Sequence, residues 1–366
     1  MSVFEVKGDK VRKLFFGDTV DIVRYDIDKY PFISGVNEEQ IGKFWRPSEI
    51  EIYPDRADFK KRLTKPEQLI FTYNLSRQTI LDSIQERAPS QLFGPLCSTP
   101  EMENWICTWP FYEQIHNKTY QYIIEGVYSD ATPIFDAITE IQPVVDCAMD
   151  IVKHYDDLIL WNAKRMMFQN GLFPDYDEFE HKRSFWRALV AVTALEGIRF
   201  YVSFACSWAF AETNRMEGNA TLIKLICRDE NLHLGVTQHL LKALPKDDKD
   251  FALIRKMDED NSMSIIEAAA EQEISWATTL FASGSMLGLN EGLLSSFVKW
   301  RTNKVLNGAG YPKLYDVTNV NPLPWTQRWI SGNDVQPAPQ EVQITSYEVG
   351  AVKQDITADF LAGLKL

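Results

Sequence analysis

Apolar residues recur at every third or fourth position through most of this 366-residue chain, and alternating runs are scarce. Such spacing is typical of amphipathic helices, whereas alternation indicates strands. We predict long helices over residues 66–85, 98–127, 144–170, 184–212, 220–244, 262–287 and 291–306. Beta structure is expected at most as one hairpin after Asn333. The pattern therefore predicts an all-α chain with helices near the length found in bundles.

The N-terminal part is expected to be less regular. Prolines and glycines interrupt residues 1–36, so we predict irregular structure there. A short helix is expected to begin at Asn37. Pro47 should end it, because the residue before a proline is pushed out of the helical region.

The predicted helix over 98–127 carries two informative prolines. Ser98, followed by Pro100 and by Glu101 three positions on, predicts a helix start capped by Ser98. Pro110, inside the helix, removes a backbone donor and crowds the preceding turn. We therefore predict a kink or a π-bulge just before Glu113, and such bulges often mark functional sites.

Two Glu-x-x-His pairs on predicted helices are the first sign of chemistry. Glu113 with His116, and Glu230 with His233, each share one helix face, and Tyr120 lies one turn beyond His116. Carboxylate and imidazole ligands suit a redox-active metal, which is placed to oxidise a nearby phenol. Fewer than one such pair is expected by chance from five histidines and 51 acids.

A third pair, Glu178 with His181, lies in a charged run without an apolar stripe. We interpret this run as a solvated helix face.

Two further acids stand in predicted helices where charge is costly. Glu196 lies at the centre of an apolar run, where an unpaired carboxylate would be strongly unfavourable, and Asp82 lies in the last turns of helix 66–85. One alternative for Glu196 is a salt bridge to Arg199 in the same helix. The other is a metal. One carboxylate from each of two helices and Glu-x-x-His from each of two others is the known di-metal pattern of ferritin-like bundles.

Charge supports the metal alternative. Four carboxylates and two divalent ions sum to zero, so the loaded site could be buried among apolar helices. The candidate ligands are Asp82, Glu113, His116, Glu196, Glu230 and His233.

Composition narrows the partners and the compartment. A net charge of -13 and a pI near 5.0 argue against binding to nucleic acid. Five cysteines without a Cys-x-x-Cys motif suggest reduced, mostly buried thiols in a cytoplasmic protein. No signal peptide is recognisable. Residues 188–211 imitate a membrane span, but Glu196 and Arg199 near its middle favour a buried core helix.

Several segments, in order, resemble the radical-generating small (beta) subunit of class I ribonucleotide reductase. They are Phe15-Phe16-Gly17, Phe44-Trp45-Arg46-Pro47, Leu81-Asp82-Ser83-Ile84-Gln85, Glu113 to Tyr120, Ala194 to Cys206, and Arg228-Asp229-Glu230-Asn231-Leu232-His233. The resemblance implies a ferritin-like helical bundle. It assigns Asp82, Glu113 and His116 to one metal and Glu196, Glu230 and His233 to the other, with Glu113 and either Glu230 or Glu196 bridging. Two iron ions are implied, and manganese is possible because oxygen and nitrogen ligands do not separate the two metals.

The resemblance also assigns roles around the metals. Tyr120 would be oxidised to a stable neutral radical, shielded by Phe200, Phe204 and Ile226, which are otherwise ordinary core residues. Trp45 and Asp229 would carry the electron and the oxidising equivalent, with Asp229 hydrogen-bonded to His116. This agrees with the tendency of ligating histidines to donate to a carboxylate.

The resemblance divides the chain into a helical domain with an N-terminal extension, 1–331, and a flexible C-terminal tail, 332–366. In the tail, Tyr347 would relay the radical, and the last residues would dock the large catalytic subunit. We also expect a homodimer, activated by a small electron donor, that does not itself bind the nucleotide substrate.

Other functions share parts of this pattern. A ferritin-like di-iron oxygenase would use the same ligands but gives no reason for Tyr120 or Tyr347, and a ferroxidase is usually shorter. A helical scaffold would bind no transition metal. Pro110, Tyr112, Gly197 and Asn231 stand next to ligands where the resemblance suggests other small or polar residues.

Overall fold

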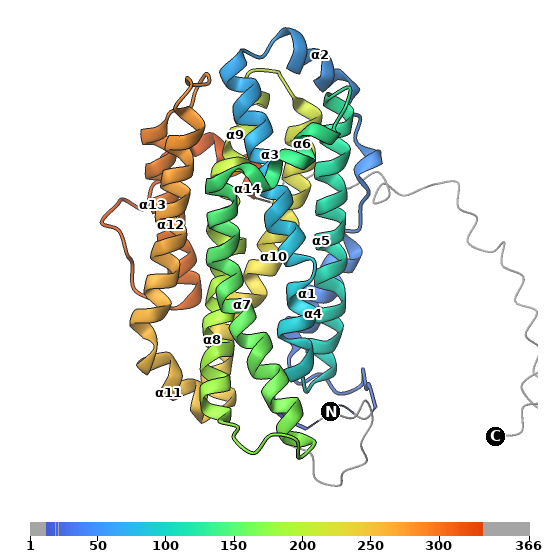
Figure 1. Cartoon of the computed structure of the whole chain (residues 1–366), viewed down its shortest axis with the longest axis vertical. Helices are drawn as coiled ribbons and strands as arrows, with labels where there is room; N and C mark the ends of the chain where they lie inside the picture. Colours follow the sequence, from blue (N-terminus) through green and yellow to red (C-terminus); the bar gives the residue numbers. More distant parts are fainter. Residues whose placement is uncertain (1–11, 19, 21, 332–366) are drawn as a thin grey trace, which may run out of the picture.

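The protein is an elongated bundle of helices lying side by side, seen here in a computed structural model that describes residues 12–18, 20 and 22–331. Figure 1 shows the long helices running along the longest axis. They are α3 (Lys65–Gln85), α5 (Pro100–Val127), α7 (Gln142–Gln169), α8 (Glu178–Ala194) with its continuation α9 (Tyr201–Ala211), α10 (Glu217–Asp247), α12 (Glu259–Phe281) and α13 (Glu291–Ala309).

Shorter helices and turns connect the long ones. The short α-helices are α1 (Pro31–Gly42), α2 (Tyr53–Lys61), α4 (Ala88–Leu92), α6 (Thr132–Ala137), α11 (Lys249–Met257) and α14 (Gln327–Ile330). The 3-10 turns are η1 (Pro47–Glu49), η2 (Gly94–Leu96), η3 (Ile138–Glu140) and η5 (Pro324–Thr326), and η4 (Leu195–Arg199) is a π-helical turn between α8 and α9.

The predicted all-α class is confirmed. Within the described ranges, the β pairing consists of two isolated bridges, Phe15 with Cys97 and Met286 with Leu289. The hairpin expected after Asn333 lies outside these ranges.

Four helix contacts form a closed ring around the core. Helix α3 packs on α5, α5 packs on α10, α10 packs on α9, and α9 packs back on α3, while α8 also contacts α10. Local capping signals in the sequence mark the starts of two of the long helices. Thr64 and Glu67 form a reciprocal capping box at α3, and Asp177 accepts two backbone N–H groups at the start of α8.

The prediction for the N-terminal part was wrong in its boundaries. Helix α1 begins at Pro31 and ends at Gly42, before Pro47, which instead opens a 3-10 turn. Both prolines occupy a first helical position, where the fixed φ of proline favours a helix and its missing N–H costs nothing. Proline here starts helices rather than ending them.

Two details of the α5 prediction were also wrong. Ser98 does not cap the helix: the N-cap is Thr99, and Ser98 Oγ instead donates to the Lys13 carbonyl. The helix continues through Pro110 without a π-bulge, so this half of the expected kink or π-bulge is wrong. Trp109 and Tyr112, on either side of Pro110, are both buried.

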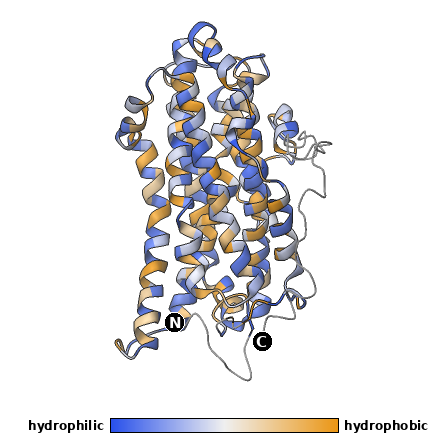
Figure 2. Cartoon of the chain, turned by 90° about the vertical axis from the view of Figure 1, so that its right-hand side faces the viewer, coloured by the Kyte–Doolittle hydropathy of each residue, from blue (hydrophilic) through white to orange (hydrophobic). Residues whose placement is uncertain are grey.

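The apolar segment that imitates a membrane span lies in the core. The continuous helical segment Glu178–Ala211 is long and apolar enough to cross a membrane, yet its apolar window is entirely buried within the bundle. Elsewhere, as Figure 2 shows, hydrophobic and hydrophilic stretches alternate along the helices, as amphipathic helices require. The five cysteines are all free, and Cys107 is the exposed one.

Candidate metal centre

The six candidate ligands come together in the interior of the bundle. Their donor atoms form two groups, each with all atoms within 4.8 Å of one another. One group contains Asp82, Glu113, His116 and Glu230, and the other contains Glu113, Glu196, Glu230 and His233. All six side chains are fully buried. Two adjacent sites that share two carboxylates are thus built from four helical segments.

The sequence did not predict the position of the π turn η4. It contains Glu196, and a π turn inserts one residue into the helical register, which is common at functional sites. Arg301 Nε donates to the Gly197 carbonyl at 2.9 Å, so a main-chain acceptor within the turn is satisfied. The bulge that we expected beside Glu113 occurs instead beside Glu196.

The salt bridge considered for Glu196 does not form. Arg199 pairs instead with Asp150 and donates to Gln272. Glu196 Oε1 accepts a hydrogen bond from Gln85 Nε2 at 2.7 Å, and the other carboxylate oxygen has no partner among the described residues. Glu196 is therefore directed to the carboxylate cluster rather than to a cation of its own helix.

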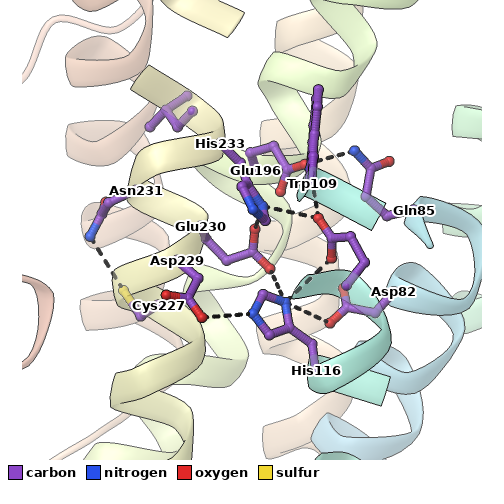
Figure 3. Close-up of polar contacts among 12 residues, drawn as sticks. Asp82, Gln85, Trp109, His116, Glu196, Cys227, Asp229, Glu230, Asn231 and His233 are labelled. Atoms are coloured by element: carbon purple, nitrogen blue, oxygen red, sulfur yellow. Dashed lines mark hydrogen bonds and ion pairs between the residues drawn. The ribbon is translucent and has the colours of Figure 1, made fainter. Parts of the chain in front are cut away.

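His116 lies between the cluster and Asp229, as Figure 3 shows. Its Nδ1 is 3.1 Å from Glu230 Oε1 and 3.7 Å from Asp82 Oδ2. Its Nε2 is 3.3 Å from Asp229 Oδ2. One ring nitrogen therefore faces the candidate ligands, and the other faces a carboxylate behind the ring.

His233 has a corresponding arrangement. Its Nδ1 lies 3.0 Å from Glu113 Oε1 and 2.9 Å from Glu230 Oε2. Its Nε2 lies 3.2 Å from the side-chain amide of Gln40 on α1. The atom of Gln40 in this contact is the amide nitrogen Nε2, and its Oε1 has no hydrogen-bond partner in the described part of the chain. A metal-bound His233 would carry a proton on Nε2, and a rotated Gln40 amide would present Oε1 as the acceptor that this N–H needs.

The electrostatic environment of the carboxylate cluster favours a bound cation. Burial and the nearby Glu113 and Glu230 raise the pKa of Asp82 well above its usual value, and burial with the same two neighbours raises that of Glu196. Burial alone would lower the pKa of His233, but the adjacent carboxylates outweigh it and raise the pKa to about 9. The cluster thus attracts cations into a place that excludes water.

Unsatisfied atoms show that a metal fits. Atoms without a hydrogen-bond partner in the described structure include both oxygens of Asp82, one oxygen each of Glu113, Glu196 and Glu230, and Nδ1 of His116. Buried polar groups are normally paired, and leaving them unpaired costs free energy. Oxygen and nitrogen donors of this kind are the ligands of first-row divalent metals. The donor set therefore fits a two-metal centre.

Tyr120 is buried next to this cluster. Burial, followed by the negative charge of Asp82, raises the pKa of its phenol well above the usual value. Its hydroxyl has no hydrogen-bond partner among the described residues. Phe200, Phe204 and Ile226 are also buried, and the two phenylalanine rings stack at 5.5 Å. The burial of these three side chains is consistent with an apolar pocket around Tyr120 and equally with ordinary core packing.

Trp45 connects to the cluster through Asp229. Trp45 Nε1 donates to Asp229 Oδ2 at 2.8 Å, the same oxygen that faces His116. The rings of Trp45 and His116 are 6.4 Å apart. Trp45, Asp229 and His116 are all buried, so the three side chains form one continuous line. Tyr347 lies outside the described residues.

Sequence reasoning missed three residues that hold the ligands. Gln85 donates to Glu196 and in turn accepts from Tyr155 at 3.1 Å. Trp109 Nε1 donates to Glu113 Oε1 at 2.8 Å. Gln85 is three residues after Asp82, and Trp109 is four before Glu113, so helical periodicity was a usable signal for both. Gln40 carries no such signal.

The third Glu-x-x-His pair is separate from the cluster. Glu178 is half exposed, as a solvated face predicts, but His181 is fully buried, so that interpretation was wrong for the histidine. His181 Nε2 faces Asn162 Oδ1 at 2.9 Å, and its Nδ1 faces the Tyr176 hydroxyl at 2.9 Å.

Comparison with known proteins identifies the family. Residues 24–322 match the family model described as "Ribonucleotide reductase, small chain". This chain belongs to that family. Among the similar proteins, the ribonucleoside-diphosphate reductase subunit beta of Haemophilus influenzae is 42% identical to this chain, over 97% of this chain and 96% of the relative. The corresponding subunit of Enterobacteria phage T4 is 36% identical over 96% and 95%.

Solved structures agree with the small-chain assignment. The R2 subunit from Clostridium botulinum has a TM-score of 0.79 and 25% identity over 90% of this chain and 98% of that one. The Streptococcus sanguinis dimanganese(II)-NrdF has a TM-score of 0.67 and 20% identity over 85% and 100%, which shows the shared fold. A small chain implies a large-subunit partner, and the buried cluster is consistent with a two-metal centre.

Proposed function

We propose that this protein generates and stores a tyrosyl radical on Tyr120 and delivers it to the large subunit of a class I ribonucleoside-diphosphate reductase. The observation that carries the proposal is the pair of buried donor groups sharing Glu113 and Glu230, with Tyr120 beside them. A purely structural set of ion pairs does not explain this arrangement, because several buried oxygen and nitrogen atoms of the cluster are left without hydrogen-bond partners.

The proposed ligands follow the two donor groups. Asp82, Glu113 and His116 would hold one metal ion, and Glu196, Glu230 and His233 would hold the other, and Glu113 and Glu230 belong to both donor groups. We propose iron, with manganese as the alternative that the same ligands accept. When bound, the metals supply the oxidising power, by reducing dioxygen, that removes one electron from Tyr120.

The protein environment determines what happens at Tyr120. A tyrosine phenol is already protonated at physiological pH, and burial beside Asp82 raises its pKa further. Oxidation to an uncharged radical would therefore have to release the hydroxyl proton as well as one electron. Burial then keeps solvent and reductants away from the ring. In this proposal the apolar side chains of Phe200, Phe204 and Ile226 contribute the shielding.

The line from Trp45 through Asp229 to His116 is the proposed path for electrons. Asp229 accepts from Trp45 and faces His116, so it fixes both rings in a path without a gap. An electron from a small donor would enter through Trp45 during activation. The oxidising equivalent would leave by the same residues during turnover and pass to Tyr347 in the tail.

The remaining parts of the proposal concern assembly. We propose that residues 1–331 form the radical-generating domain and that residues 332–366 form a tail that docks on the large subunit. The protein is proposed to act as a cytoplasmic homodimer. The nucleotide is proposed to bind to the large subunit.

The test is electron paramagnetic resonance after loading the apoprotein with ferrous iron and oxygen. We expect two irons per chain and a tyrosyl signal that is absent in Tyr120→Phe. Tyr122→Phe is the matched control: Tyr122 is in the same helix, but its hydroxyl donates to the Ile50 carbonyl at 2.9 Å, away from the cluster. The control should keep both the metal and the signal.

Other results would point elsewhere. Two bound irons without a radical would contradict the proposal for iron and favour an oxygenase or ferroxidase. The loading experiment would then be repeated with manganese in place of iron. A protein that binds no transition metal would overturn every metal-dependent function at once.

A further inference from the structure

The last described helix is attached to the surface of the bundle by a set of side-chain contacts, which include an ion pair between Arg328 and Glu212. Helix α14 has no fully buried side chain, although it packs against α10. It ends one residue before Ser331, the last residue that the structure describes. Whatever holds α14 therefore determines where the described part of the chain ends on the bundle.

One of these contacts comes from the residue next to a candidate ligand. Asn231, which follows Glu230, donates from Nδ2 to the Ile330 carbonyl at 3.0 Å. Its Oδ1 accepts from the Tyr201 hydroxyl at 3.0 Å, which fixes the orientation of the amide. Figure 3 shows Asn231 extending away from the metal-ligand cluster, on the other side of α10. Asn231 thus faces α14 and takes no part in the cluster.

The second contact is aromatic. Trp329 stacks on Trp208 of α9, with ring centroids 6.1 Å apart and planes 8° from parallel. Trp208 is fully buried, so it offers a fixed surface. Trp329 Nε1 also donates to Glu212 Oε1 at 2.8 Å. Stacking and the indole N–H together place Trp329 in one orientation.

We propose that Asn231 and the Trp208–Trp329 stack form an anchor that sets the starting point, and thereby the free length, of the C-terminal tail. All three are positioning residues: they contact neither the candidate ligands nor Tyr120 in the described contacts. The consequence for turnover rests on the proposed function, because it requires Tyr347 in the tail to relay the radical.

The expected size of the effect follows from chain length. Thr326 is the last fully buried residue before α14, so a released α14 would free the chain from about that residue onward. The proposed tether before Tyr347 would grow from about 17 to about 21 residues. The effective concentration of a tethered group falls roughly as the −3/2 power of tether length, so delivery by Tyr347 should fall by about a quarter.

The first experiment measures the anchor itself, without needing a radical. A nitroxide is attached at Ser331→Cys in a Cys107→Ser background, because Cys107 is the exposed native thiol. We expect a broad, immobilised spectrum in the parent and a sharper one in Asn231→Ala and Trp329→Ala. Asn231→Asp keeps the acceptor for Tyr201 but loses the donor to Ile330, so it should also sharpen. Thr221→Ala, elsewhere on α10, should not.

The second experiment measures the consequence in unlabelled full-length variants. Metal content and the Tyr120 signal should equal those of the parent. Maximal turnover with the large subunit should fall by about a quarter, while the concentration of large subunit needed for half-maximal turnover stays unchanged. Trp329→Phe, which retains a stacked ring, should restore most of the turnover lost in Trp329→Ala.

Two results would overturn the inference. One is a nitroxide equally mobile in the parent and in Asn231→Ala. The other is a mobile label with unchanged turnover. A parent without a radical would instead contradict the proposed function, and the label would still show whether Asn231 and Trp329 anchor α14.

Discussion

Individual side chains behind the ligands fix the orientation of both histidines. Asp229 stands behind His116, and Gln40 stands behind His233. Such groups select the tautomer that leaves the other ring nitrogen free for metal. Gln40 is itself held in place, because the Tyr112 hydroxyl donates to its backbone carbonyl. A residue on α1 thereby supports a ligand on α10.

We predict that Gln40→Leu weakens metal binding roughly 10- to 100-fold while leaving the fold intact. Leucine preserves much of the volume but offers no acceptor for the His233 N–H. Competition with a chelator of known affinity measures the change. Gln78→Leu is the matched control, because Gln78 is an equally buried glutamine with no hydrogen bond to a ligand. Equal affinities in the two variants would contradict the role of Gln40.

His181 should make the protein acid-sensitive. Burial, followed by the charge of Arg165, lowers its pKa to about 3. The unfolded chain, with a histidine pKa near 6.5, therefore takes up a proton that the folded chain refuses. The stability contributed by neutral His181 is complete above pH 6.5 and is lost as the pH falls from there toward 3.

The matching variant is His181→Gln, whose amide can still bond both Asn162 and Tyr176. Between pH 6.5 and 4.5 the parent apoprotein should lose about 2 kcal/mol more unfolding free energy than the variant. Denaturant unfolding at both pH values measures this difference. An equal loss in both proteins would show that another group causes the acid sensitivity.

At the scale of elements, the π turn depends on a close approach that only glycine allows. A Cβ on Gly197 would lie 2.6 Å from Val305 Cγ2 and 3.0 Å from Leu234 Cδ1. Val305 is β-branched and stiff, so it cannot easily move away. Because Gly197 has no side chain, η4 can pack directly on α13 and α10.

Gly197→Ala should therefore destabilise the protein by about 1–3 kcal/mol through overpacking. Adding Val305→Ala should recover part of this loss, since it removes the nearer clashing methyl group. Thermal unfolding of the single and double variants measures both effects. If Gly197→Ala is as stable as the parent, the close packing around η4 is not as tight as the distances indicate.

The sequence predicted the long helices and four of the six clustered side chains from periodicity within one helix. Glu113 with His116 and Glu230 with His233 are such local patterns. Asp82 and Glu196 stand out because a charge is costly in an apolar helix and because they complete the di-metal pattern. The position of the π turn was not predictable in this way, since it depends on Arg301 and Val305, about a hundred residues away. The start of α1 was missed because Pro31 was treated as a breaker, although proline also favours a first helical position.

At the scale of the whole molecule, the ligands join α3, α5, η4 and α10, which all contribute to the central packing. We predict that loading the apoprotein with two ferrous ions under anaerobic conditions raises its thermal midpoint. A ligand bound only by the folded state adds about 2.7 kcal/mol at a hundredfold excess over its dissociation constant. Glu230→Ala, which removes a member of both donor groups, should abolish the increase. A similar increase in that variant would place the stabilising metal elsewhere.

Glu230 belongs to both donor groups, and it lies late in the chain, on α10. During synthesis, a nascent chain that has emerged only as far as η4 already exposes Asp82, Glu113, His116 and Glu196, yet neither donor group is complete. The full donor set exists only after α10 has been translated and has docked against α5. Metal affinity at the proposed centre would therefore rise with completed folding, and truncated or partly folded chains would compete poorly with the finished protein for the cell's supply of reactive metal.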